Sequence, residues 1–199
     1  QYVLQQLSED THGESVVVTG VGQHQMWAAQ HYRFKEPNTW LTSGGLGAMG
    51  FEVPAALGAK VGRPDKTVWS IAGDGGFQMT MCDLATAVES QIDVKFAILN
   101  NGVLGMVHQW QEFFYDKDFF ATEYSGNPDF VKIAEAYGIK GIRVTDKAQV
   151  VGAIREAMET PGPVLLDFIV KPDEPVYPMI PAGESVNEMM EEPITERVS

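Results

Sequence analysis

Two apolar runs that each stop at short polar residues and glycine constrain the fold of this chain more than any other feature. The first run, residues 67–72, ends at Gly73-Asp74-Gly75-Gly76, and the second, residues 94–99, ends at Asn100-Asn101-Gly102. The helix-length segment between them predicts a strand, a helix and a second strand. A right-handed crossover then places both strand ends at the same carboxyl edge of one parallel sheet.

Asp74 and Asn101 are therefore expected to lie close together. One carboxylate and one amide oxygen, beside glycines that let a ligand approach the backbone, suit a magnesium ion that also holds a diphosphate. Either loop alone is equally compatible with an ordinary turn of an α/β domain. The pair at this spacing favours the metal site.

Strand-like and helix-like segments alternate along most of the chain. The expected strands cover residues 15–19, 40–42, 67–72, 94–99, 141–144 and 163–170, and the expected helices include residues 23–32, 55–59, 103–111, 128–137 and 148–158. This alternation predicts an α/β fold, an open doubly wound parallel sheet with helices on both faces. We expect one domain, residues 1–171, and then an extended acidic arm, residues 172–199, in which prolines disfavour regular helix.

Charge and composition narrow the classes of partner. The chain has 199 residues and a formal charge of -13, which argues against nucleic acid or an anionic membrane as partner. No apolar run is long enough to span a bilayer, and the N-terminus lacks the pattern of a signal peptide. Cys82 has no second thiol to pair with, so we expect a reducing compartment and a small core residue. Because the chain begins at Gln1, we expect it to be a piece of a longer protein.

Two further segments have the composition of ligand-binding loops. Gln23 and His24 open a predicted helix directly after two glycines, where backbone amides can accept an anion such as phosphate. Gly45, Gly47 and Gly50 spell G-x-G-x-x-G before another predicted helix. That motif is weak evidence for a dinucleotide fold here, because the strand before it is short and no acidic residue follows at the expected distance. Met49, between these glycines, is as compatible with core packing as with ligand contact.

An aromatic cluster follows the second polar loop. It comprises Phe113, Phe114, Tyr115, Phe119, Phe120 and Tyr124. Such a cluster suits a substrate channel or a subunit contact, and equally ordinary core packing. Asn127-Pro128 then predicts a helix start with Pro128 at the first helical position.

Four of these stretches together resemble a known family. They are TGVGQHQMWAAQ (residues 19–30), TSGGLGAMGF (residues 42–51), LNNGVLGMVHQWQ (residues 99–111) and GPVLLDF (residues 162–168). They are similar to the carboxy-terminal thiamine diphosphate-binding domain of the catalytic subunit of acetohydroxyacid synthase, also called acetolactate synthase. The resemblance covers nearly the whole chain, and its motifs are specific.

The resemblance assigns roles to individual residues. It makes Asp74, Asn101 and the backbone carbonyl of Val103 the magnesium ligands, and it places Trp110 over the substrate pocket, although Trp110 also suits core packing. The residues that it implies for cofactor binding are Gln23, His24, Gly47, Met49, Gly73, Gly75, Gly76, Gly105 and Met106.

The resemblance also implies a reaction and partners. The family decarboxylates pyruvate and joins the product to pyruvate or 2-ketobutyrate, which begins branched-chain amino-acid synthesis. The glutamate that activates the cofactor is expected in an amino-terminal domain of a neighbouring subunit, so no catalytic residue is assigned here, and FAD is expected in the full-length enzyme. A homodimer or tetramer, a possible regulatory subunit, and a location in the cytoplasm or an organelle matrix are also implied.

Two alternatives remain at this point. Another thiamine diphosphate decarboxylase or carboligase, such as pyruvate oxidase or glyoxylate carboligase, would share Asp74 and Asn101, although the residues MVHQWQ (106–111) favour the synthase. The second alternative is a non-catalytic module that dimerises without cofactor. Four glutamates lie near the motifs, and we expect each to be a simple polar position on a helix or loop: Glu52, Glu89, Glu112 and Glu123.

Overall fold

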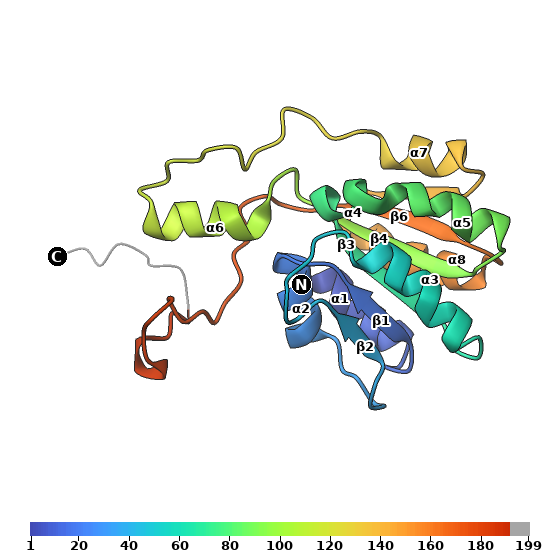
Figure 1. The fold of residues 1–199 in the computed structure, drawn as a ribbon, viewed down its shortest axis with the longest axis horizontal. Coiled ribbons are helices and arrows are strands. Elements are labelled where there is room, and N and C mark those ends of the chain that lie inside the picture. Colours follow the sequence, from blue (N-terminus) through green and yellow to red (C-terminus); the bar gives the residue numbers. More distant parts are fainter. Residues whose placement is uncertain (192–199) are drawn as a thin grey trace.

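Six parallel strands form one sheet in the order β2-β1-β3-β4-β6-β5 (Figure 1). The structure is a computed structural model that describes residues 1–191. Every pair of neighbouring strands in the sheet is parallel. The strands are β1 (Val16–Thr19), β2 (Trp40–Thr42), β3 (Val68–Gly73), β4 (Val94–Asn100), β5 (Lys140–Val144) and β6 (Val164–Ile169). The predicted open, doubly wound parallel sheet is confirmed.

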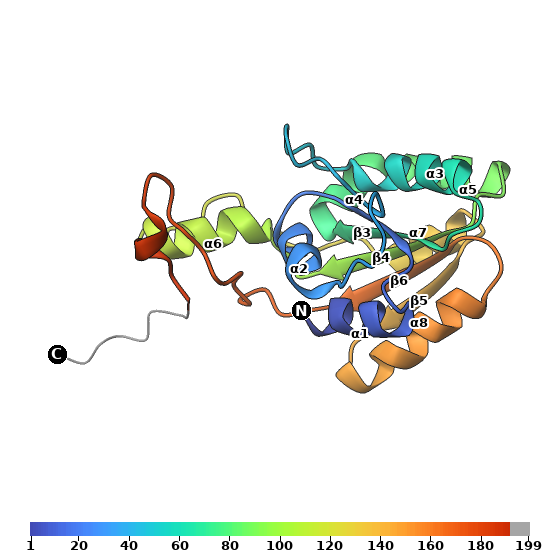
Figure 2. The ribbon, with the colours of Figure 1, turned by 90° about the horizontal axis from the view of Figure 1, so that it is seen from below.

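Helices cover both faces of the sheet, as Figure 2 shows. One face is covered by α1 (Tyr2–Asp10), α2 (Gln23–His31) and α8 (Val150–Glu159). The other face is covered by α3 (Glu52–Gly62), α4 (Asp74–Thr80), α5 (Leu84–Glu89) and α7 (Phe130–Ala136). Short 3-10 helices lie at η1 (Met81–Asp83), η2 (Lys147–Gln149) and η3 (Val186–Glu188).

The central strands are apolar on both faces because each face packs against helices. In β3, Val68 and Ala72 belong to the core beneath α3, whereas Trp69 and Ile71 belong to the core beneath α1 and α2. Fully burying a side chain such as Ile71 contributes roughly 1.5–3 kcal/mol of stability. These two cores hold the carboxyl ends of β1, β3 and β4 in fixed register.

Several local predictions were wrong. The helix after β3 begins at Asp74 itself, and η1 interrupts it. Cys82, which lies in η1, is exposed rather than a core residue. Helix α7 begins at Phe130 rather than at Pro128, because the Asp129 carboxylate caps it by accepting the Lys132 N–H at 3.2 Å. The predicted helix start at residue 103 was also early, because Val103 pairs with Glu123 in an antiparallel bridge.

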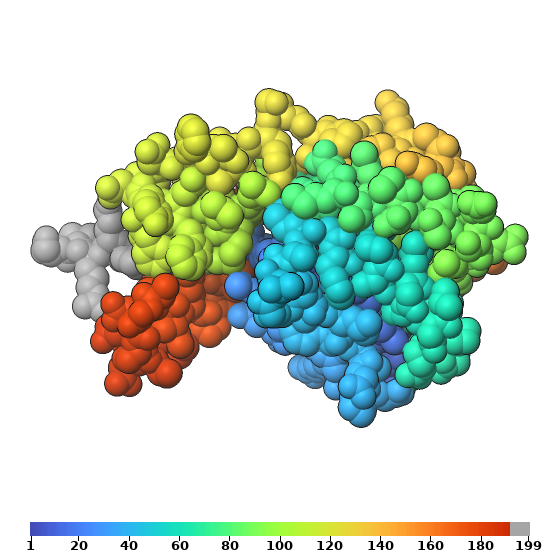
Figure 3. All heavy atoms as spheres, viewed as in Figure 1, coloured from blue at the N-terminus to red at the C-terminus, as the bar shows by residue number. Residues whose placement is uncertain are grey.

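Helix α6 (Gly105–Phe114) projects away from the sheet, and part of the C-terminal segment runs beside it (Figures 1 and 3). Between residues 172 and 191 the chain forms only η3 and a bridge between Met179 and Met190. The remainder of the predicted acidic arm, residues 192–199, lies outside the described residues. Within residues 1–191, no helix is both long enough and apolar enough to cross a membrane.

Candidate cofactor site

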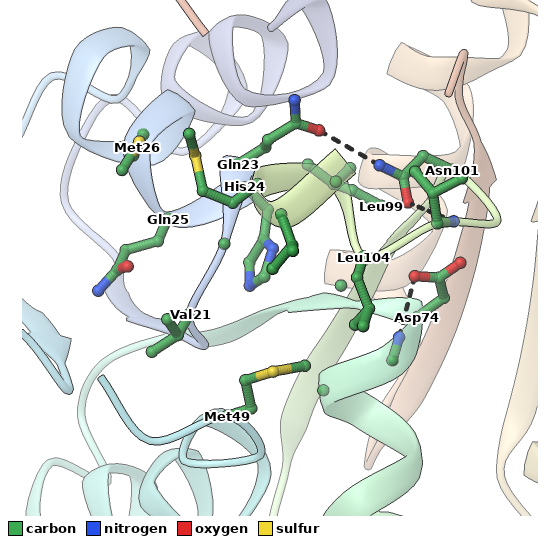
Figure 4. A pocket seen from close by; sticks show the side chains of 18 of the residues that line it. Val21, Gln23, His24, Gln25, Met26, Met49, Asp74, Leu99, Asn101 and Leu104 are labelled. Atoms are coloured by element: carbon green, nitrogen blue, oxygen red, sulfur yellow. Dashed lines mark hydrogen bonds between the residues drawn. The ribbon is translucent and has the colours of Figure 1, made fainter. Parts of the chain in front are cut away.

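A pocket of about 250 Å³ opens at the carboxyl edge of the sheet, where four chain segments meet (Figure 4). The segments are the turn between β1 and α2, the loop between β2 and α3, the junction of β3 with α4, and the loop between β4 and α6. Most of the predicted site residues line this pocket, namely Gln23, His24, Met49, Gly73, Asp74, Gly75, Gly76, Asn101, Val103, Gly105 and Met106. The fold thus brings together residues that are up to 83 positions apart in the sequence, from Gln23 to Met106.

Asp74 connects the two strand ends. Its side chain is 1% exposed, and its Oδ1 accepts the Gly75 N–H at 2.9 Å. Its Oδ2 accepts the Gly102 N–H at 2.8 Å and the Asn127 Nδ2–H at 2.6 Å. Burial raises the pKa of Asp74, and the hydrogen bonds from Asn127, Gly102 and Gly75 oppose that rise. A cation beside this carboxylate would favour its charged form further.

Asn101 faces Asp74 from the end of the neighbouring strand. Its Nδ2 donates to Gln23 Oε1 at 3.3 Å, and its Oδ1 accepts the Val103 N–H at 3.3 Å. Figure 4 shows Gln23, Asn101 and Asp74 around the same side of the pocket. A carboxylate and an amide oxygen therefore meet there, as expected from parallel strands that end together.

His24 supplies a neutral polar group to the pocket. Its ring is 6% exposed, and its Nε2 has no hydrogen-bond partner in the part of the chain that the structure describes. Burial lowers the pKa of His24 to about 4, so the imidazole is neutral at pH 7. A buried polar atom without a partner costs free energy unless a ligand supplies one.

Glycines leave the space that these side chains fill. A Cβ on Gly105 would lie 2.1 Å from Gln23 Oε1 and 2.7 Å from Asn101 Nδ2. A Cβ on Gly73 would lie 3.0 Å from the His24 ring. Any larger residue at Gly105, the first residue of α6, would therefore displace the side chains of Gln23 and Asn101.

Comparison with known proteins identifies this arrangement. The family model described as "Thiamine pyrophosphate enzyme, C-terminal TPP binding domain" matches residues 20–168, which include every segment of the pocket. The chain belongs to this family. The membership supports thiamine diphosphate, the same molecule as thiamine pyrophosphate, as the cofactor of the pocket.

Within this family, the chain is similar to acetolactate synthases. The chain is 50% identical to acetolactate synthase 2, chloroplastic, of Nicotiana tabacum over 96% of its own length. It is 50% identical to the acetolactate synthase large subunit of Corynebacterium glutamicum over 93% of its length, and 49% identical to the acetolactate synthase of Mycobacterium leprae over 95%. The chain spans about 30% of the length of these relatives. The resemblance to this enzyme's cofactor domain is confirmed.

The pocket fits a metal-bound diphosphate by its donor chemistry. Asp74 and Asn101 offer the hard oxygen atoms that magnesium prefers, and the unpartnered His24 Nε2 and the open glycine backbone suit a polar ligand. Residues 1–191 hold no group of three or more His, Cys, Asp or Glu side chains that could bind a metal. A site here therefore depends on the few protein oxygens already named, with the ligand's own oxygens completing the shell.

Two predicted residues lie outside the pocket. Gly47 is in an exposed turn with φ of +65°, a conformation that favours glycine. Trp110 is 38% exposed in a neighbouring groove of about 970 Å³, so it is not a core residue. Met26 and Met106 line both the groove and the pocket, so the two hollows adjoin.

The sequence analysis missed three residues that support the site. Asn127 was interpreted only as a helix start, yet its Nδ2 donates to Asp74 and to Asn100 Oδ1. The Tyr124 hydroxyl lies against Gly75, and burial, with the nearby Asp74 charge, raises its pKa to about 12. Gln109 donates and accepts hydrogen bonds between α6 and the C-terminal segment. No local pattern marks these residues, because each contacts a partner distant in sequence.

Proposed function

We propose that this chain is the diphosphate-binding domain of an acetolactate synthase, which condenses pyruvate with pyruvate or 2-ketobutyrate. The observation that carries the proposal is the meeting of Asp74, Asn101 and Gln23 at one sheet edge, beside a buried His24. When bound, thiamine diphosphate supplies the carbanion chemistry that decarboxylates a 2-keto acid and joins the remainder to a second one. The protein's own contribution is binding, orientation and exclusion of water.

In this proposal magnesium is held by Asp74, Asn101 and the Val103 carbonyl. Asn127 and the backbone of Gly102 hold the Asp74 carboxylate in place through hydrogen bonds of 2.6 and 2.8 Å. A fixed carboxylate needs little reorganisation when the cation arrives, so these supporting bonds strengthen metal binding. His24, neutral at pH 7, supplies hydrogen-bonding capacity to the cofactor without adding charge.

The wider assembly belongs to the same proposal. We infer an amino-terminal domain of a neighbouring subunit as the source of the activating glutamate, a homodimer or tetramer, a regulatory subunit, and FAD in the full-length enzyme. The supporting observation is that the pocket opens on the same side as the exposed groove around Trp110 and Phe114, which offers a surface to a second chain. The cytoplasm or an organelle matrix is the compartment that fits this assembly.

Calorimetry of the Asp74→Asn variant tests the proposal. The substitution keeps the size of the side chain but removes the negative charge that faces magnesium, so the affinity for thiamine diphosphate with Mg²⁺ should fall tenfold or more, about 1.4 kcal/mol at least. Asp65→Asn is the matched control, because Asp65 is an exposed aspartate that pairs with Arg63, away from the pocket. Unchanged affinity in Asp74→Asn would remove Asp74 from the metal site.

A further inference from the structure

Glu52 is a buried carboxyl group for which the proposed chemistry has no use. Its side chain is 0% exposed, and neither carboxyl oxygen has a hydrogen-bond partner within residues 1–191. The expectation that Glu52 is a simple polar position on a helix was therefore wrong. Burying an ionised carboxylate without a partner costs a large free energy, so this position disfavours the charged form of Glu52.

The Glu52 carboxyl group lies among three glycines. A Cβ on Gly20 would come within 2.4 Å of Glu52 Oε2, and a Cβ on Gly76 would come within 3.0 Å of Glu52 Oε1. The backbone N–H of Gly50 lies near the carboxyl group without forming a hydrogen bond to it, and it partly opposes the rise in the pKa of Glu52. Glycine at positions 20 and 76 thus leaves the room that the carboxyl group occupies.

Each of these glycines belongs to, or adjoins, a segment that lines the pocket. Gly20 precedes Val21, Gly50 follows Met49, and Gly76 lines the pocket itself, while Glu52 does not reach it. The carboxyl group therefore lies behind the pocket wall, in contact with the chain on either side of it. Because interiors are close-packed, a change in this group displaces the segments that it touches.

We propose that Glu52 is a positioning residue for cofactor binding, whose carboxyl group sets the spacing of the segments at Gly20, Gly50 and Gly76. The inference rests on the proposed function for the identity of the ligand. Glu52 touches no reacting atom and acts through the backbone that lines the pocket. Only the neutral acid keeps this spacing of the segments, because an ionised carboxylate at this site would draw in water or move the segments apart.

The surroundings of Glu52 contain little that would stabilise its charge. Burial raises the pKa of Glu52 to about 7, and only the backbone N–H groups of Glu52 and Gly50 oppose the rise. Strands β1 and β3 beneath it carry no titratable side chain. The other elements packed against α3 carry four titratable groups: Asp74 on α4, Cys82 and Asp83 on η1, and Lys95 on β4. The Asp74 carboxylate accepts hydrogen bonds from Gly75, Gly102 and Asn127. The Lys95 Nζ donates to the carbonyls of residues 160 and 162.

The test compares wild type, Glu52→Gln and Glu52→Ala, with Glu89→Gln on the exposed surface of α5 as control. Glutamine keeps the size and stays neutral at every pH. Calorimetry would measure the affinity for thiamine diphosphate with Mg²⁺ at pH 6.5 and pH 8.5. Between these values wild type should lose on the order of tenfold more affinity than Glu52→Gln, because only wild type ionises at this position. His24 and Asp74 are common to both proteins, so their contributions cancel.

Urea unfolding without cofactor gives a second readout. A raised pKa stabilises the folded protein below the unfolded value of 4.5, and that stability is lost as the pH rises towards 7. The midpoint for wild type should therefore fall relative to Glu52→Gln over this range, while Glu89→Gln should follow wild type. Glu52→Ala, if folded, should bind cofactor less tightly at both pH values, without the extra alkaline loss.

The outcomes separate this inference from the proposed function. If wild type binds no thiamine diphosphate at either pH, the proposed function fails, and the urea series still decides whether Glu52 ionises inside the fold. If the cofactor binds, but Glu52→Gln and wild type share one pH profile, Glu52 is not a positioning residue. A Glu52→Ala variant with wild-type affinity would overturn the inference in the same way.

Discussion

Burial shifts the pKa values of the two titratable residues that line the pocket in opposite directions. It lowers the pKa of His24 and raises that of Asp74, and in each case it favours the neutral form. Asp74 has three hydrogen-bond donors that oppose the effect, whereas within residues 1–191 no charged neighbour does so for His24. The imidazole therefore stays neutral at pH 7, and Asp74 is the group that the proposed function assigns to the cation.

The lowered pKa of His24 makes a prediction about acid stability. A histidine whose folded pKa lies below its unfolded value of 6.5 contributes stability that is present above pH 6.5 and is lost as the pH falls towards 4. Relative to His24→Gln, wild type should lose on the order of 3 kcal/mol across this range. Urea unfolding at pH 7 and pH 4.5 would measure it, and parallel losses in both proteins would contradict the assignment.

Trp110 makes a prediction about specificity. Its exposed ring lies in the groove that adjoins the pocket through Met26 and Met106, where a second keto acid could contact it. In the full-length enzyme that the proposal implies, Trp110→Leu should weaken the preference for 2-ketobutyrate over pyruvate by about 1–3 kcal/mol. Product ratios from competing substrates would measure the change. Phe120→Leu, in the same groove, is the control, and an unaltered ratio in Trp110→Leu would exclude the role.

At the scale of elements, Gln109 links α6 to both the pocket and the C-terminal segment. Its Oε1 accepts hydrogen bonds from Gln23 Nε2 at 3.0 Å and from the Val176 N–H at 2.8 Å, and its Nε2 donates to the Val176 carbonyl at 3.1 Å. Gln23 in turn accepts from Asn101. A continuous set of amides thus runs from a candidate metal ligand to the segment beside α6.

We expect Gln109→Leu to release the C-terminal segment from α6. Leucine has similar size but leaves the buried N–H and carbonyl of Val176 without partners, which costs about 1–3 kcal/mol for each group. Thermolysin, which cleaves on the amino side of apolar residues, should then cut before the normally buried Val176 several times faster than in wild type. Gln6→Leu, on α1, is the control because the Gln6 side chain bonds to Glu9 on the same helix rather than to the C-terminal segment. Equal cleavage rates in Gln109→Leu and wild type would show that other contacts hold the segment.

At the scale of the whole molecule, none of the described glutamates lines the pocket. Glu52 is buried behind it, and the Glu123 side chain is 62% exposed and paired with His108. A proton-transfer partner typically contributes 10²- to 10⁴-fold to rate, and an open pocket admits water. We therefore predict that the chain alone, with thiamine diphosphate, Mg²⁺ and pyruvate, makes no acetolactate.

A colorimetric assay for acetolactate on the purified 199-residue chain would check this prediction. Adding the amino-terminal domain as a separate chain should restore some turnover, because it would supply the expected carboxylate. Steady acetolactate production by the chain alone, abolished by Asp74→Asn, would show instead that the active site is complete within these residues.

The sequence by itself determined the sheet and most of the pocket residues. Strands that are buried on both faces, such as β3 and β4, can be predicted from their continuous apolar composition. The parallel crossover then places their carboxyl ends at the same edge of the sheet. The sequence alone therefore predicts that Asp74 and Asn101 lie close together. Local sequence patterns are enough for this prediction, because the positions of the strand ends depend only on the strand direction and on the handedness of the crossover.

Only the tertiary structure decided the supporting residues and the charge states. Asn127 and Gln109 act on partners far along the chain, and no short pattern encodes such contacts. The neutral state of His24 and the burial of Glu52 depend on how completely neighbouring elements exclude water, which is a property of packing in three dimensions. A glutamate at the start of a helix has the same local pattern whether the fold exposes it or encloses it.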